Sequence, residues 1–347
     1  MARVRTVLGE IDSADLGPTL FHEHLILNGE SAFHAPAPDD AEGWEIARSP
    51  VAMRYLGRLR NDPYLSLDNC RLDSITVAEA EIERFVHAGG RTVVDVTPPG
   101  SGRSPLALVE IARATGLNVV MGCGFYLERT HPAGLADEGV DVLAELIARD
   151  VVEGVDGVHA GVIGEVGVGI DFSPAEERSL RAAARAQRMT GVPLCVHLPG
   201  WLRYGHRVLD IVETEGGALG ATVLCHMNPS HADLSYQRSL ADRGAWIEYD
   251  MLGMEFFYPG EGQSPSDEEN AAAIAQLIAD GYAHRVLLSH DVFIKTLLHT
   301  YGGFGYAHVL TGFAERLERH GVGRDALLSI LTDNPRAVFE AAAERRA

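Results

Sequence analysis

The sequence is poor in positive charge. Lys and Arg together number 29 among 347 residues, against 49 Asp and Glu, which gives a formal net charge of -20. A surface with this balance repels phosphate groups over most of its area. We therefore expect neither nucleic acid nor a membrane as a partner, and a small molecule as the substrate.

Long apolar runs and cysteine clusters are also missing. No apolar run is as long as the roughly 18 residues of a membrane helix, and the first residues lack the apolar core of a signal peptide. We therefore expect a cytoplasmic protein. The cysteines form no CxxC pair, which argues against a disulfide framework and a thiolate zinc site and favours buried, reduced thiols. They are Cys70, Cys123, Cys195 and Cys225.

No linker rich in Pro, Gly or Ser divides the chain, so we expect one domain over residues 1–347. Apolar residues make up 46% and charged residues 22%, the balance of a chain that buries a sizeable core. The stretch 28–75 is the exception, because it is long and dotted with prolines. Loops of this length are usually functional or disordered, and we predict either a lid or a dimer contact.

Short β-branched runs alternate with amphipathic segments along the whole chain. One such segment has Ser173 as a candidate N-cap, Pro174 at the first helical position and Gly191 at its end. This alternation predicts an α/β fold, a (β/α)₈ TIM barrel. The predicted strands cover residues 18–24, 91–97, 118–126, 160–166, 192–198, 221–227, 245–250 and 284–291.

The ends of these predicted strands carry the chemistry, because a (β/α)₈ barrel builds its active site at the carboxyl ends of its strands. His22 and His24 are two residues apart, so both imidazoles should face the barrel interior while Glu23 points away. Polar side chains end most of the other runs. They are Tyr126, Glu165, His197, His226, Asp250 and Asp291.

Six of these side chains predict a metal site. A single strand histidine is more often a core residue than a ligand, but imidazoles and carboxylates at separate strand ends would be costly to bury without a cation. The set is too large for one tetrahedral ion and suits two, with Glu165 as a bridge. Zinc fits these donors best, and manganese, cobalt or iron would use the same ones. The candidate ligands are His22, His24, Glu165, His197, His226 and Asp291.

The motifs LFHEHLIL, CVHLPG, LCHMNPS, LLSHDV, YGGFGY and DNPRAVF follow one another between residues 17 and 338. In this order they resemble the phosphotriesterase-related branch of the amidohydrolase superfamily. The resemblance implies a homodimer and a binuclear centre, with His22, His24 and Asp291 on the buried ion and His197 and His226 on the exposed one.

The best-known members of that family bridge their ions with a carbamylated lysine, whereas the run GVIGEVGVG offers Glu165 and no lysine. A glutamate bridge is similar to that of phosphotriesterase homology proteins and of carboxylate-ester or lactone hydrolases. We therefore predict that a metal-bridging hydroxide attacks an ester or lactone carbonyl. An amide or a phosphoester, including a phosphotriester, is the alternative substrate, and a non-catalytic binding protein is a third reading.

Two residues are candidates for direct catalytic roles. Asp291 would take the proton released on attack, or serve only as a ligand. Tyr126 would steady the developing oxyanion, or form an aromatic wall of the pocket.

Four further residues are candidates for binding substrate. Lys295 and Arg203 would each meet an anionic group, or form surface ion pairs instead. Trp201 would supply an apolar wall. Asp250 would orient a leaving group, hold a histidine in one tautomer or cap a helix.

Overall fold

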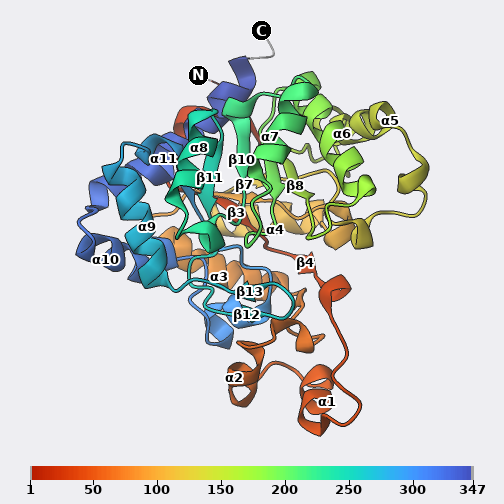
Figure 1. The fold of residues 1–347 in the computed structure, drawn as a ribbon, viewed down its shortest axis with the longest axis vertical. Helices are drawn as coiled ribbons and strands as arrows, with labels where there is room; N and C mark the ends of the chain where they lie inside the picture. The colour runs from red at the N-terminus through yellow and green to blue at the C-terminus, as the bar shows by residue number, and fades with distance from the viewer. Residues whose placement is uncertain (1, 345–347) are drawn as a thin grey trace.

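Parallel strands form a closed barrel in the computed structural model, which describes residues 2–344 (Figure 1). Regular ladders join the first three barrel strands and, separately, the remaining five. This confirms the predicted α/β barrel. In chain order its strands are β3 (Thr19–Glu23), β6 (Thr92–Asp95), β7 (Asn118–Met121), β8 (Ile163–Gly167), β9 (Leu194–His197), β10 (Thr222–Leu224), β11 (Trp246–Tyr249) and β14 (Val286–Leu288).

Isolated hydrogen bonds close the two gaps between the ladders. Between β7 and β8, the Gly161 amide donates to the Met121 carbonyl at 2.9 Å. Between β14 and β3, the Asp291 amide donates to the His22 carbonyl at 3.2 Å. The second gap therefore lies directly beside two of the candidate metal ligands.

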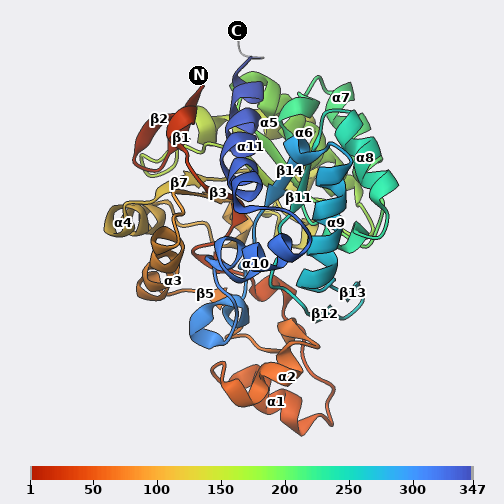
Figure 2. The same cartoon turned by 90° about the vertical axis from the view of Figure 1, so that its left-hand side faces the viewer.

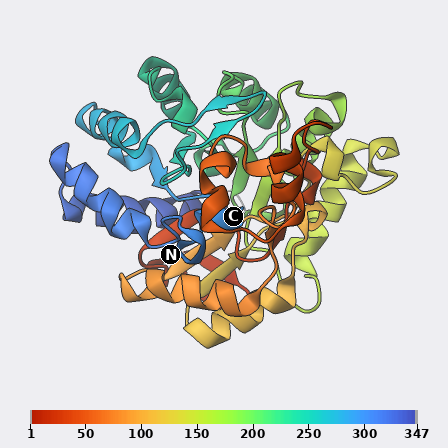
Figure 3. The ribbon, with the colours of Figure 1, turned by 90° about the horizontal axis from the view of Figure 1, so that it is seen from below.

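Helices surround the barrel, as the view from below shows (Figure 3). Outside the stretch 28–75, one α-helix follows each of the first seven barrel strands, and two follow β14. They are α3 (Ile75–His87), α4 (Pro105–Thr115), α5 (Val140–Val152), α6 (Pro174–Thr190), α7 (Gly205–Thr214), α8 (Leu234–Asp242), α9 (Asp267–Ala279), α10 (Gly312–Arg319) and α11 (Arg324–Glu344).

Helix α6 has the ends that its sequence predicts. The Ser173 hydroxyl accepts from the Glu176 amide, and the Glu176 carboxylate accepts from the Ser173 amide, which completes a capping box. Gly191 ends the helix with φ of 66°, in the left-handed region where a side chain would be strained. Helix α9 begins with the same kind of capping box, at Ser266.

Apolar side chains pack in two layers. One fills the barrel interior and is closed at the amino-terminal end by the hairpin of β1 (Arg3–Thr6) and β2 (Gly9–Asp12) and by α11 (Figure 2). The other lies between the sheet and the helices. All four cysteines are buried and free, as predicted. Among the described residues no helix is long and apolar enough to cross a membrane.

The predicted long insertion is an ordered appendage that extends from the barrel (Figures 1 and 2). It is joined to the barrel by the antiparallel pair β4 (Leu27–Asn28) and β5 (Arg71–Leu72), and it contains α1 (Ala41–Arg48) and α2 (Leu56–Leu59). A small core of its own holds these helices together. The core consists of Ile46, Tyr55, Leu59 and Leu65.

Candidate metal centre

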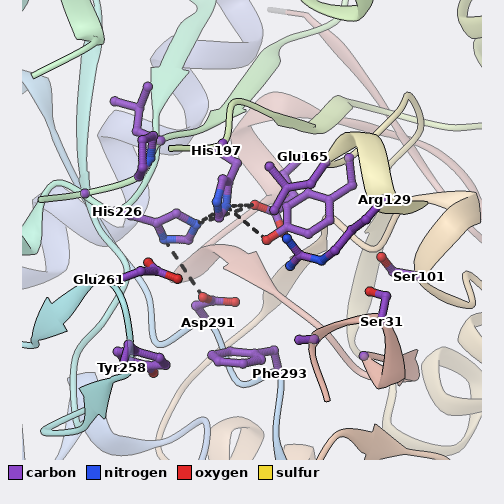
Figure 4. Close-up of a pocket in the computed structure, with 18 of the residues that line it drawn as sticks. Ser31, Ser101, Arg129, Glu165, His197, His226, Tyr258, Glu261, Asp291 and Phe293 are labelled. Atoms are coloured by element: carbon purple, nitrogen blue, oxygen red, sulfur yellow. Dashed lines mark hydrogen bonds and ion pairs between the residues drawn. The ribbon is translucent and has the colours of Figure 1, made fainter. Parts of the chain in front are cut away.

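The candidate ligands converge at the carboxyl end of the barrel (Figure 4). His24 Nε2 lies 3.1 Å from Asp291 Oδ1. On the other side of the cluster, His197 Nδ1 lies 3.0 Å from Glu165 Oε2 and 2.8 Å from His226 Nε2. Two imidazole nitrogens and a carboxylate oxygen thus face one small volume, which is an arrangement that suits a shared cation.

His22 gives the clearest sign that a cation belongs here. Its ring is fully buried, and neither ring nitrogen has a hydrogen-bond partner among residues 2–344. Its Nε2 points between Glu165 Oε2 at 3.7 Å and Asp291 Oδ1 at 3.6 Å. Buried polar atoms are rarely left without a partner, so this unpaired nitrogen fits a metal ligand better than a core residue.

Donor atoms form three groups among the described residues, and His22 belongs to each of them. His22, His24 and Asp291 offer three atoms within 4.8 Å of one another, and so do His22, Glu165 and His226; the third group joins His22 to Cys225, Glu248 and Asp250. The first group contains the three residues that the family resemblance assigns to the buried ion, and the second contains His226, which the resemblance assigns to the exposed ion. The cluster is therefore able to bind metal.

The electrostatics of the cluster also favour a cation. Burial lowers the pKa of His22, but the surrounding carboxylates outweigh burial and raise that pKa to about 10. Burial raises the pKa of Glu165, and the neighbouring histidines, His197 first, bring it well below its usual range. Glu165 is therefore ionised at neutral pH and places negative charge where the imidazoles meet.

Partners behind the candidate ligands fix which ring nitrogen faces the cluster. Thr97 Oγ1 lies 2.8 Å from His24 Nδ1, which leaves Nε2 free. Asp250 Oδ1 lies 3.0 Å from His226 Nδ1 and also accepts from the His226 amide. Such contacts hold the tautomer and orientation of a ligand.

Glu23 points away from the cluster, as predicted, and braces the turn that carries Asp291. Its Oε1 accepts from the Ser289 hydroxyl at 2.8 Å and from the His290 amide at 2.9 Å, and its Oε2 accepts from the Val292 amide at 2.9 Å. The turn places Asp291 at a φ of 50°. A non-glycine residue keeps such a backbone only when its surroundings hold it there.

Three of the predicted substrate-binding residues lie elsewhere. Lys295 pairs with Asp68 at 2.6 Å, because the insertion brings that carboxylate to it. Arg203 lies 3.5 Å from Asp233 and does not line the pocket. Asp250 is fully buried beneath His226, so it orients a histidine and does not contact substrate.

Tyr126 and Trp201 do line the pocket beside the cluster. Tyr126 lies beyond the end of β7, which is shorter than predicted, and its hydroxyl is 3.3 Å from His197 Nδ1. Trp201 lies after β9, and its Nε1 donates to the Gln263 carbonyl at 3.2 Å.

The pocket has a volume of about 410 Å³ and opens above the cluster. The insertion supplies part of its wall, including Ser31 and Tyr64. Apolar side chains form much of the remaining wall. Those from the loops after β11 and β14 are Met251, Met254, Tyr258, Phe293 and Ile294.

Sequence reasoning missed three side chains at this site. Arg129 and Glu261 line the pocket, but both follow their barrel strands in loops that no pattern assigns to the site. Glu248 lies on β11 beneath the cluster, with Oε2 3.7 Å from His22 Nδ1, and burial raises its pKa to about 7. Its signal was the charged residue in the apolar run AWIEYD.

A parallel barrel with a buried cluster of histidines and carboxylates at its carboxyl end defines a metal-dependent hydrolase. The chain belongs to the Phosphotriesterase family, which it matches over residues 2–339. It is 32% identical to the N-acetyltaurine hydrolase of Salmo salar over 340 residues, which cover 96% of this chain and 97% of that protein.

Solved structures agree with this assignment. A resiniferatoxin-binding protein from Rhodobacter sphaeroides is 49% identical, with a TM-score of 0.95 over 97% of this chain and 95% of that one. The phosphotriesterase homology protein from Escherichia coli, solved with phosphate in its active site, is 26% identical, with a TM-score of 0.76 over 94% and 99% of the two chains.

Proposed function

We propose that the protein uses two divalent ions, zinc first among them, to hydrolyse the amide bond of small N-acyl compounds. The observation that carries the proposal is the convergence of His197, His226 and Glu165 on one volume beneath a pocket of about 410 Å³. Whole-length similarity to N-acetyltaurine hydrolases supports the choice of an amide. This places amides before the esters and lactones that the sequence alone favoured.

Divalent ions in such a cluster lower the pKa of a water molecule and polarise a carbonyl oxygen. The chain's own residues supply the rest. Asp291 is buried and ionised, because its histidine neighbours outweigh the effect of burial on its pKa, so it can accept the proton of the attacking water and return it to the leaving amine. Tyr126 presents its hydroxyl beside His197, where it can donate to a developing oxyanion.

Hydrolysis of a carboxylic ester or lactone is the second candidate. The apolar wall around Trp201 and Phe293 suits an ester or lactone ring as well as an acyl chain. The proton that Asp291 returns is less important for an ester, because an alkoxide is a better leaving group than an amide anion. An ester substrate would therefore tolerate Asp291→Asn better than an amide would.

The test combines elemental analysis with substrate profiling. Purified protein should contain about two ions per chain, and chelation should remove turnover of N-acetyltaurine, which zinc, manganese or cobalt then restores. Aryl esters, lactones and phosphotriesters are assayed alongside. Turnover of esters or lactones without amides would replace the proposal with its second candidate, and no metal-dependent turnover of any class would leave a binding protein.

A further inference from the structure

Two charged side chains of opposite sign face each other across the candidate metal centre. Arg129 follows β7 and Glu261 follows β11, the third and seventh strands of an eight-strand barrel, so their loops rise from opposite sides of its mouth. Figure 4 shows Arg129 on one side of the candidate ligands and Glu261 on the other. Both line the pocket, and Arg129 is the single Lys or Arg of its described lining.

Neither side chain is neutralised within the protein. Among residues 2–344, no carboxylate lies within 4.0 Å of the Arg129 guanidinium, and no Lys, Arg or His nitrogen lies within 4.0 Å of the Glu261 carboxylate. Neither makes a side-chain hydrogen bond among these residues. Lys295 and Arg203, in contrast, both have carboxylate partners. The two pocket charges are therefore available to a ligand.

Arg129 is carried by a well-braced segment. It lies in the short 3-10 helix Glu128–Thr130, where the Thr130 amide donates to the Leu127 carbonyl at 2.8 Å. The Glu128 amide donates to Glu176, the residue that completes the capping box of α6. The guanidinium thus extends from a segment that its own turn and helix α6 hold in place.

Glu261 lies at the tip of the hairpin formed by β12 (Phe257–Tyr258) and β13 (Gly262–Gln263). Its amide donates to the Tyr258 carbonyl at 3.0 Å and closes the turn. Trp201 packs against the hairpin, so closely that a Cβ at Gly262 would lie 2.5 Å from its Nε1. The contact holds the hairpin that carries Glu261 against another residue of the pocket lining.

The charges of Glu261 and Arg129 both influence Tyr64, which belongs to the insertion. Burial raises its pKa, the negative charge of Glu261 raises it further, and the positive charge of Arg129 opposes them. Glu261 also adds to the raised pKa of Tyr258. Arg129 and Glu261 are exposed at the rim of the pocket, as are Glu128 and Asp171, the other free carboxylates of the lining. Glu261 differs from these two carboxylates in its place, because it follows β11, on the side of the barrel opposite the strand that Arg129 follows.

We propose that Arg129 and Glu261 are specificity-determining residues that select a dipolar substrate, with an anionic group on one side of the scissile amide and an ammonium group on the other. This inference rests on the proposed amide hydrolysis and goes further, because it sets the chemical class and the direction of binding. The anionic amine that leaves lies towards Arg129, and the acyl part with its ammonium lies towards Glu261. A carboxylate or a sulfonate satisfies Arg129 equally in charge.

Matched substrates test the two poles of the pocket separately. The anionic pole is Arg129, which would bind the anionic group, and the other pole is Glu261, which would bind the ammonium group. Glycyltaurine carries both charges, propionyltaurine replaces the ammonium by a methyl group, and glycyl propylamide and propionyl propylamide lack the anion. Glycyl-β-alanine replaces the sulfonate by a carboxylate and distinguishes the two anions. We expect kcat/KM to fall about tenfold with the loss of either charge, since each ion pair lies in a partly exposed pocket.

Two variants assign each pole to its residue. Arg129→Gln should remove the advantage of anionic substrates, mainly by raising KM, while turnover of glycyl propylamide changes less than about threefold. Glu261→Gln should remove the advantage of glycyl over propionyl substrates and leave propionyltaurine unaffected. Arg113→Gln on α4 and Glu145→Gln on α5 remove the same charges from exposed helix positions and should change neither preference.

Binding calorimetry with glycyltaurine and propionyltaurine separates this inference from the proposed function. If the affinities follow the same charge pattern but neither ligand is turned over, amide hydrolysis is overturned. The roles of Arg129 and Glu261 in binding the two charges are then kept. Turnover of propionyltaurine with no preference for glycyltaurine, in wild type and Glu261→Gln alike, would overturn the dipolar substrate and keep amide hydrolysis. An Arg129→Gln variant that binds both ligands like the wild type would overturn the anionic pole.

Discussion

His22 reaches the cluster through an irregularity in its strand. The pairing of β3 with β6 shifts register between Leu20 and Glu23. Phe21 packs into the barrel interior, so strict alternation would turn His22 outward, and the shift returns it inward. The pairing of β8 with β9 shifts in the same way around Glu165.

His226 turns inward by another route. The preceding Cys225 faces the barrel interior, and His226 adopts a φ of 57°, which redirects its side chain. Asp250 accepts from its amide and from its ring, so one carboxylate holds both the backbone and the imidazole. The geometry at this position therefore depends on Asp250 directly.

Asp250→Asn should lower metal affinity about 10- to 100-fold. The amide oxygen of Asn can still accept one hydrogen bond, so the fold should survive, but the negative charge behind the His226 ring is lost. Competition with a chromophoric chelator measures the dissociation constant. Unchanged affinity would mean that the backbone conformation alone orients His226.

Tyr126→Phe distinguishes an oxyanion donor from an aromatic wall. If the hydroxyl donates to the developing charge, kcat should fall about 100-fold with KM and metal content unchanged. A wall role predicts a changed KM and a normal kcat. Tyr204→Phe is the matched control, because the Tyr204 hydroxyl donates to the Ile170 carbonyl and does not line the pocket.

Helix α9 is joined to its surroundings by a buried carboxylate at its first position. Asp267 accepts from the Gly253 amide at 2.7 Å and lies 2.6 Å from His308 Nε2. It therefore links the loop after β11 with the segment after β14. Burial raises the pKa of Asp267, but His308 first and then the amide and Arg316 bring it below its usual value.

The stability that Asp267 contributes should be lost in acid. Since its folded pKa is lower than its unfolded one, the contribution is present above about pH 4 and disappears as pH falls through the folded pKa. Asp267→Asn should lower the free energy of unfolding by about 2 kcal/mol at pH 7, and the difference should narrow below pH 4. Urea titrations across this range measure it.

Asp242→Asn is the control for that series, because Asp242 accepts from the Tyr282 hydroxyl at an exposed site. A difference between Asp267→Asn and wild type that stays constant from pH 7 to pH 3 would contradict a role for the charge.

Much of the molecule could be predicted from its sequence. The short β-branched runs predicted the barrel, and the residue types at the ends of these runs predicted the six candidate ligands. Both predictions depend only on local sequence patterns. Arg129 and Glu261 could not be found this way, since loop side chains reach a site only through the tertiary path of their loops. The partner of Lys295 could not be found for the same reason, because Asp68 meets it from 227 residues away.

Lys295 is the single lysine of the chain, and it holds the insertion against the barrel. Its Nζ lies 2.6 Å from Asp68 and 3.5 Å from Asp73, and its amide donates to the Asn69 carbonyl. The pair is partly buried, so its loss should matter more than that of a surface pair.

Lys295→Met should make the insertion several-fold more sensitive to limited proteolysis while the barrel stays folded. Mass spectrometry of the fragments locates the cuts, which we expect between residues 30 and 70. Arg203→Met, which removes an exposed ion pair with Asp233, should digest like the wild type. Equal digestion of all three proteins would show that Asn69 and the β4–β5 pair suffice to hold the insertion.

The burial of every native thiol has a practical consequence for spectroscopy. Maleimide dyes should leave the folded wild-type chain unlabelled, since all four cysteines are buried and unpaired. Met53, whose side chain is 86% exposed, lies in the insertion. A cysteine introduced there would carry a single fluorophore, and its emission would report in real time how the insertion responds when the pocket is filled.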